Sequence, residues 1–156
     1  MNGSRHVMQA LLLATALTTV ARPASAQVGL TFWAGAGAAK SAGSAAFGKE
    51  AKQLGVQLGL PLLPFAVRAD ALMLGPGFDT DAVGYNLNAV LQLRVPIVQP
   101  YVLAGRGSYA LESNTHADGW NAGGGVRVGF GRVGGFAEVR RHYPIKRTIT
   151  VVGLTF

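Results

Sequence analysis

Apolar and polar residues alternate with a period of two along most of this chain, in segments separated by turn residues. Such alternation predicts β-strands that have one apolar and one polar face. Glycine recurs inside the segments, which disfavours helices. We predict about eight strands with these apolar positions: Val28, Leu30, Phe32, Ala34 and Ala36; Leu54, Val56, Leu58 and Leu60; Phe65, Val67, Ala69, Ala71 and Met73; Tyr85, Leu87, Ala89, Leu91, Leu93 and Val95; Tyr101, Leu103, Gly105, Gly107, Tyr109 and Leu111; Trp120, Ala122, Gly124, Val126, Val128 and Phe130; Val133, Gly135, Ala137, Val139 and Tyr143; Thr150, Val152, Leu154 and Phe156.

The last of these segments carries the strongest signal. Val152, Leu154 and Phe156 share one face, and the sequence stops on the aromatic residue. A final strand that ends on an outward aromatic is typical of transmembrane barrels. We therefore predict that these three residues form the assembly signal of such a barrel and that the last strand closes against the first.

The amino terminus has the three parts of a secretory signal peptide. Arg5 and His6 precede an apolar run over residues 7–20, and Ala24-Ser25-Ala26 is a small-x-small cleavage site. A membrane-spanning helix would need about 20 apolar residues, and this run ends at Arg22-Pro23. We predict residues 1–26 to be the signal peptide and residues 27–156 to be a single barrel domain.

Alternation alone also fits a soluble barrel whose apolar face points inward. The residues on the polar face distinguish such a soluble barrel from a membrane barrel. This face carries amides and glycines such as Gln57, Asn86, Asn88 and Gly125, with arginine as its main charge. Lysine, expected on a solvated surface, stands only in loops or at strand ends. Small residues and amides suit the narrow lumen of an eight-stranded barrel. The polar face is therefore predicted to lie inside and the apolar face to meet lipid.

The connections alternate between short and longer ones, with the longer ones at residues 38–49, 75–81, 112–119 and near Pro144. Outer-membrane barrels have short periplasmic turns, longer external loops and both termini in the periplasm. Aromatic girdles mark the two membrane interfaces of such barrels. We predict Phe65, Tyr101, Phe130 and Phe156 for the periplasmic girdle, and Tyr85, Tyr109, Trp120 and Tyr143 for the outer one.

Charged residues fall on inward positions of several strands. A charge in a narrow lumen is costly unless it is paired, and arginine suits bidentate pairing with carboxylates. We predict a network in which Asp70 and Glu138 are each bracketed by arginines. Its members are Arg68, Asp70, Arg94, Arg106, Arg127, Glu138 and Arg140. Structural filling of the lumen is the favoured interpretation; the alternative is a narrow pore that prefers anions, because arginine outnumbers acid.

Overall composition excludes several other functions. The formal net charge is +7, but the basic residues are scattered and the protein is predicted to be exported, so nucleic acid is not an expected partner. Cysteine is absent, which excludes disulfides and thiolate chemistry. Asp79 and Asp81 offer too few oxygens for Ca²⁺, and His142 has no nearby second His or Cys for a metal site. We expect no cofactor and no metal.

One cluster of residues leaves an enzymatic alternative. Ser113, His116 and Asp118 lie in the predicted third external loop and superficially match a nucleophile, a base and an orienting acid. A catalytic triad is defined by geometry, and these residue types are also ordinary in turns. A lipid-modifying enzyme of the outer membrane therefore remains only a minor alternative.

Several segments resemble the small outer-membrane β-barrel family related to the OmpA transmembrane domain and to OmpX. The residues are Tyr101-Val-Leu-Ala-Gly-Arg-Gly-Ser-Tyr109, Gly119-Trp-Asn-Ala-Gly-Gly-Gly-Val-Arg-Val128, Phe136-Ala-Glu-Val-Arg140 and Val152-Gly-Leu-Thr-Phe156. The resemblance implies an eight-stranded antiparallel up-and-down barrel in a Gram-negative-type outer membrane, inserted by the barrel assembly machinery. We expect a monomer surrounded by membrane lipid and lipopolysaccharide, with a structural or surface-interaction role and no catalytic activity. The peptidoglycan-anchoring role of full OmpA proteins is not carried over.

Overall fold

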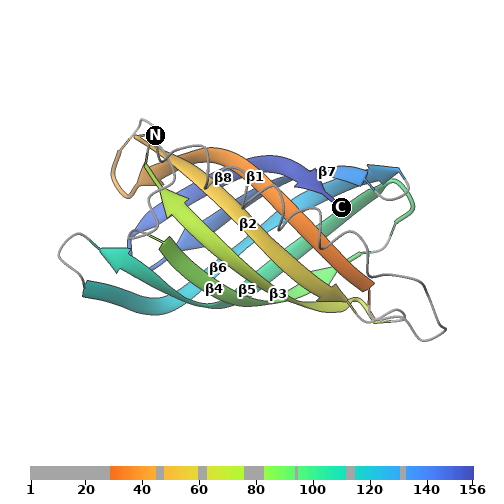
Figure 1. Cartoon of the computed structure of the whole chain (residues 1–156), viewed down its shortest axis with the longest axis horizontal. Coiled ribbons are helices and arrows are strands. Elements are labelled where there is room, and N and C mark those ends of the chain that lie inside the picture. The colour runs from red at the N-terminus through yellow and green to blue at the C-terminus, as the bar shows by residue number, and fades with distance from the viewer. Residues whose placement is uncertain are drawn as a thin grey trace, which may run out of the picture.

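The chain forms a closed antiparallel β-barrel in the computed structural model, which describes residues 29–44, 48–59, 63–75, 83–93, 95–111, 115–130 and 133–156. Eight strands follow one another around the barrel (Figure 1). They are β1 (Gly29–Ser41), β2 (Lys49–Gly59), β3 (Phe65–Leu74), β4 (Val83–Gln92), β5 (Val98–Leu111), β6 (Thr115–Phe130), β7 (Val133–His142) and β8 (Arg147–Thr155). The predicted fold class is confirmed. The predicted signal peptide lies outside the described residues.

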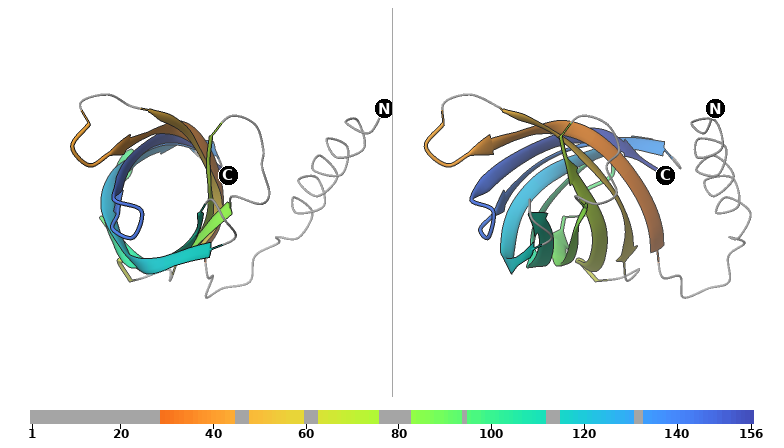
Figure 2. Two further views of the ribbon diagram at one scale, coloured as in Figure 1. Left: turned by 90° about the vertical axis from the view of Figure 1, so that its left-hand side faces the viewer. Right: turned by 60° about the vertical axis from the view of Figure 1, so that its left-hand side comes forward.

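The barrel closes between its first and last strands, as the end-on view in Figure 2 shows. Gly35 pairs with Gly153, and Phe32 and Phe156 exchange two backbone hydrogen bonds of 3.0 and 2.8 Å. Every strand therefore has two paired neighbours, and the sheet has no open edge. A closed sheet satisfies its backbone groups without water, which is the condition for spanning a membrane with strands.

The register fixes how far the strands are staggered. Stepping from Lys40 to its partner on each successive strand returns to β1 at Leu30, ten residues away, so the shear of this barrel is ten residues. The path runs through Lys40, Thr148, Arg141, Ala122, Ala104, Ala89, Val67, Leu58 and Leu30. Ten residues over eight strands means that each step across changes height by about 1.25 residues.

The interior of the barrel is its core, and the apolar face of seven strands points outward. Leu54, Leu87 and Val152 are 49%, 60% and 60% exposed, whereas lumen residues such as Leu72 and Ile149 are buried. These seven strands agree with the faces predicted from the sequence. Met73 lies on the outward side beside its register partner Lys52, yet it is only 8% exposed. No helix in the described part is long and apolar enough to span a membrane, a criterion that does not address strands.

β5 has the opposite orientation to the predicted one. Tyr101, Leu103 and Tyr109 are buried in the lumen, while Val102 is 57% exposed and Arg106 is also exposed. Gly105 and Gly107 face inward as well, where a Cβ atom would collide with Asn88 or Asn86. The physical reason is that the lumen at this level admits glycine and uses tyrosine hydroxyls as donors, as described below.

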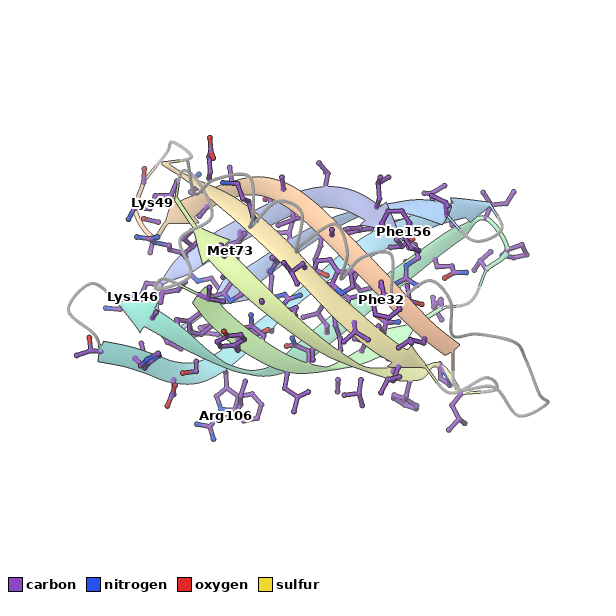
Figure 3. All side chains as sticks on the ribbon, in the orientation of Figure 1. Phe32, Lys49, Met73, Arg106, Lys146 and Phe156 are labelled. Carbon is purple, nitrogen blue, oxygen red and sulfur yellow. The ribbon has the colours of Figure 1, made fainter. Side chains whose placement is uncertain are left out.

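The hairpin between β5 and β6 is also longer than predicted. β6 begins at Thr115, so His116 and Asp118 stand on a strand and only residues 112–114 connect β5 to β6. The connections at this end, 42–48, 75–82, 112–114 and 143–146, lie opposite the end that carries both termini of the barrel. Figure 3 shows this polarity, with Lys49 and Lys146 towards one end and Phe32 and Phe156 towards the other.

Candidate functional site

Four charged side chains meet at mid-height in the lumen, two from β3 and two from β7. Arg68, Asp70, Glu138 and Arg140 are 2%, 6%, 2% and 1% exposed. They come together because residues two apart on a strand project to the same side, and because β3 and β7 lie across the narrow lumen from each other. We call these four residues the central charge cluster. Its two arginines and two carboxylates balance in charge.

Glu138 lies between the two arginines of the cluster. Its Oε2 accepts a hydrogen bond from Arg68 Nη1, and its Oε1 accepts from Arg140 Nε at 3.0 Å and from Arg140 Nη2. The hydroxyl of Tyr101 also donates to Glu138 Oε2, at 2.8 Å. Glu138 is therefore bracketed by arginines as predicted, and the tyrosine donor comes from the strand whose orientation the sequence pattern misassigned.

Asp70 is held differently from the prediction. Arg140 Nη1 donates to both of its oxygens, at 3.0 and 2.9 Å. The other donors are two amides, Asn86 Nδ2 at 2.9 Å and Asn88 Nδ2 at 3.2 Å. Asp70 thus has one arginine and two asparagines around it instead of two arginines. Within the described part of the chain, Arg140 is the one side chain bonded to both carboxylates, so it is the central member of the cluster.

A layer of amides and aromatic rings closes the lumen on the side of the chain termini. Gln57 Oε1 accepts from Arg68 Nε and Nη2, at 3.1 and 2.8 Å, and Gln57 Nε2 donates to Gln92 Oε1 at 3.1 Å. The Arg68 guanidinium also lies 5.0 Å from the ring of Trp33 and 4.8 Å from that of Tyr101. These contacts fill the space below the cluster with side chains.

A second layer closes the lumen on the opposite side. The hydroxyl of Tyr109 donates to Asn86 Oδ1 at 2.6 Å, and His142 Nδ1 lies 2.8 Å from the same hydroxyl. Because the single proton of that hydroxyl points to Asn86, His142 Nδ1 acts as the donor in the second bond. Asn121 Nδ2 also donates to Asn86 Oδ1, at 3.3 Å. His142 therefore joins the lumen packing, and the described residues hold no group of side chains that could bind a metal ion.

The remaining predicted lumen charges are not part of the cluster. Arg127 is on an inward position of β6 near the terminal end of the lumen, and its Nε is buried without a hydrogen-bond partner. Arg106 points outward from β5, so its prediction as a lumen residue is wrong. Arg94 lies outside the described residues. Sequence reasoning missed Trp33, Tyr101 and Tyr109 as lumen residues; the signal that favours the lumen for the two tyrosines is that they share their face of β5 with Gly105 and Gly107.

The outer surface carries a continuous uncharged band. Corrected for the stagger, its members lie between Phe65 and Phe156 at one height and Tyr85 and Trp120 at another. The separation of these two levels is roughly 20 Å from strand rise and tilt. The band consists of Phe32, Ala34, Ala36, Leu54, Val56, Leu58, Val67, Ala69, Ala71, Leu87, Ala89, Leu91, Val102, Ala104, Ala122, Gly124, Val126, Gly135, Ala137, Val139, Thr150, Val152 and Leu154.

Aromatic side chains stand outward at both edges of this band. Phe65 and Phe156 are 54% and 56% exposed at the terminal end, and Tyr85, Trp120 and Tyr143 are 64%, 62% and 57% exposed at the other. Tyr101 and Tyr109 are buried inside, so their assignment to the girdles is wrong, for the same reason as the β5 inversion. The side chain of Phe130 lies outside the described part of the structure.

The triad considered from the sequence is not assembled in the described residues. His116 and Asp118 are exposed and two residues apart on β6, on the outward side of the barrel. Ser113 lies outside the described ranges, as do Asp79 and Asp81. The site with defined geometry is therefore the lumen network, in which the four charged side chains of the central charge cluster bond to one another.

No protein-family model and no curated protein matches the chain. Solved structures do share its fold. A de novo designed transmembrane β-barrel superposes with a TM-score of 0.59 at 13% identity, covering 83% of this chain and 96% of the design. Neisserial surface protein A gives 0.56 at 15%, with coverages of 81% and 93%. Ail, the attachment invasion locus protein of Yersinia pestis, solved with the heparin analogue sucrose octasulfate, gives 0.50 at 14%, with coverages of 81% and 96%.

Proposed function

We propose that this chain is an integral outer-membrane β-barrel protein with a sealed lumen, acting as a structural and surface-interacting element without catalytic activity. The observation that carries the proposal is the uncharged band around the whole barrel. Soluble monomers rarely expose apolar patches larger than a few hundred Å², whereas a barrel in lipid needs such a band, about 25 Å tall and flanked by aromatic residues. The likeness to transmembrane barrels supports the fold on which this rests.

The even number of strands and the outward side chains of the last strand support the orientation and biogenesis that we propose. Barrels with an even number of strands keep both termini in the periplasm, which makes the end with Lys49 and Lys146 external. Val152, Leu154 and Phe156 are all exposed on the outer side of the terminal strand, which pairs with β1. Insertion machinery can bind these outward side chains while the strand is being paired. Membrane lipid and lipopolysaccharide are then the direct surroundings of a monomer.

Surface interaction is assigned to the external end. Lys49 and Lys146 are exposed there, and Lys40 and Arg147 lie close to them in the strands β1 and β8, which pair at this end. A concentration of basic groups favours anionic partners at the cell surface. Ail, which shares the fold, was solved in complex with the heparin analogue sucrose octasulfate, which supports a sulfated, anionic partner as a candidate for this small barrel as well.

The two tryptophans of the chain offer a direct test of the lipid-facing surface. Trp120 is 62% exposed on the outer edge of the band, whereas Trp33 is 3% exposed inside the lumen. We expect brominated acyl chains to quench Trp120 in the W33F variant strongly and to leave Trp33 in the W120F variant nearly unquenched. The measurement is tryptophan fluorescence in vesicles. Equal quenching of the two, or none, would contradict a membrane-spanning barrel.

Conductance distinguishes a sealed barrel from the anion-preferring pore. Because the central charge cluster and the layers on both sides of it fill the lumen, the reconstituted protein should show no steady single-channel current in a planar bilayer. Heat modifiability on a gel serves as the control that the inserted protein is folded. A reproducible current with anion preference would replace our proposal with the pore, for which the inward Arg127 would be the first residue to test.

A further inference from the structure

Arg106 is a charged side chain at the border of an otherwise uncharged surface. It points away from the barrel, as Figure 3 shows. Its guanidinium lies 5.8 Å from the ring of Trp120, its register partner on β6. Among the described residues it has no carboxylate or hydrogen-bond partner within bonding distance. The described protein therefore supplies no counter-ion for this guanidinium, and an anion that pairs with it would have to come from the surroundings.

The height of Arg106 identifies where that counter-ion would lie. Corrected for the stagger of the strands, Lys52, Tyr85, Arg106, Trp120 and Arg141 stand within roughly two residues of one level. This level contains outward basic and aromatic residues in alternation. The opposite edge of the band has only apolar outward side chains in the described ranges, among them Phe65, Val128 and Val133. The charge asymmetry matches a membrane whose external leaflet is rich in anionic headgroups.

A shallow, open recess lies beside Arg106 at this level. It has a volume of about 470 Å³ and lies across β5, between β4 and β6. It is lined by Tyr85, Asn86 and Leu87 from β4, by Arg106, Gly107 and Ser108 from β5, and by Asp118 from β6. Leu87 is at the membrane side of the recess, where it continues into the uncharged band, and Asp118 is at the external side.

This order of residues fits one class of molecule. Guanidinium groups bind phosphate through paired charge-assisted hydrogen bonds, and Trp120 behind Arg106 holds it by a cation–π contact. Tyr85 offers an aromatic face to a sugar ring, while Ser108 and the Asp118 carboxylate can accept hydrogen bonds from sugar hydroxyls. Apolar residues below receive acyl chains. We propose that the recess binds a phosphorylated glycolipid of the outer leaflet, with its phosphate on Arg106, its sugar between Tyr85 and Asp118, and its acyl chains along Leu87.

This inference rests on the proposed membrane location, and the test keeps the two apart. The full barrel, refolded in uncharged detergent, is titrated with bisphosphorylated lipid A, with the same lipid after removal of its phosphates, and with inorganic phosphate. Complexes are counted by native mass spectrometry. The variants are R106Q, R106K and the matched control R141Q. Arg141 is outward at the same level, but its Nη1 already donates to Thr148 Oγ1 at 3.1 Å.

We expect R106Q to weaken binding of bisphosphorylated lipid A about tenfold, as loss of a charged hydrogen-bonding group does. R106K should recover part of that loss, and R141Q should stay within about twofold of wild type. The dephosphorylated lipid should bind wild type no better than R106Q binds the phosphorylated one.

Three results would overturn the site: wild-type affinity in R106Q, an equal loss in R106Q and R141Q, or displacement of lipid A by equimolar inorganic phosphate. Heat modifiability of each variant shows that its barrel is closed. Failure of the membrane location would instead appear as absent quenching of Trp120 by brominated lipid, whatever R106Q binds.

Discussion

Replacing Arg140 with methionine should destabilise the barrel by about 3–5 kcal/mol, the usual cost of removing one partner from a buried ion pair. Arg140 is 1% exposed and, among the described residues, is the only arginine bonded to Asp70. Its loss leaves a buried carboxylate with only amide donors, while Glu138 keeps Arg68. The measurement is equilibrium unfolding by urea or guanidinium in lipid vesicles, with heat modifiability to count the folded fraction.

The next residue in the sequence supplies the control for this prediction. Arg141 points outward at the edge of the band, so R141M should change the stability by no more than about 1 kcal/mol. Adding D70N to R140M removes the uncompensated charge and should recover at least about 1 kcal/mol of stability. Equal effects of R140M and R141M, or no recovery in the R140M/D70N double variant, would show that the central charge cluster does not have the energetic role that its geometry indicates.

The faces of most strands could be predicted from the sequence because lipid and lumen select opposite residue types. Along β4, for example, the exposed Tyr85 and Leu87 alternate with the buried Asn86 and Asn88, so one facing of the strand places these amides in the lumen and these two apolar side chains in lipid. β7 has a weaker pattern, yet Glu138 and Arg140 still mark its inward face. Their partners on β3 could be anticipated as a class, since a narrow lumen admits charges only in pairs.

β5 could not be assigned in the same way because both of its faces look apolar. Tyr101, Leu103 and Tyr109 form the bulkier set, and placing them in lipid required Arg106 to lie inside. The structure reverses this. The tyrosine rings fill the lumen while their hydroxyls bond to Glu138 and Asn86. At the outer edge of the band, an outward arginine costs little, about 0–1 kcal/mol compared with 2–4 kcal/mol at the bilayer midplane.

The geometry of the central charge cluster lay beyond the sequence for a related reason. Whether Asp70 meets a second arginine or an asparagine depends on which side chains face each other across the lumen. That is set by the shear of the barrel, and the shear becomes known only when every register is known. Arg106 shows how much depends on such assignments. Because β5 presents the opposite face to the lumen from the predicted one, Arg106 lies in the lipid-facing recess and not in the predicted network.

Gly153 in β8 provides the second large effect, because the barrel closes where this residue faces Gly35. A Cβ atom at position 153 would lie closer than 3.0 Å to Gly35 Cα, to the backbone oxygen of Ala34 and to the ring of Phe136. Phe136 cannot retreat easily, since it packs edge-on against Trp33 with ring centroids 5.1 Å apart. We expect G153A to cost about 3 kcal/mol, the upper part of the range for overpacking a core, and to reduce the heat-modifiable fraction of the protein.

A glycine one strand away is the matched control for closure. Gly135 pairs with Leu154 and faces outward, and a Cβ atom there meets only the backbone oxygen of Gly153 at an ordinary 3.7 Å. G135A should therefore change stability by about 0.5 kcal/mol or less. If both variants fold and unfold like wild type, the close approach of β1 and β8 is not what allows the lumen to be packed. If only G153A fails to close, the seam between the first and last strands limits assembly, because that seam leaves no room for a side chain between Gly35 and Phe136.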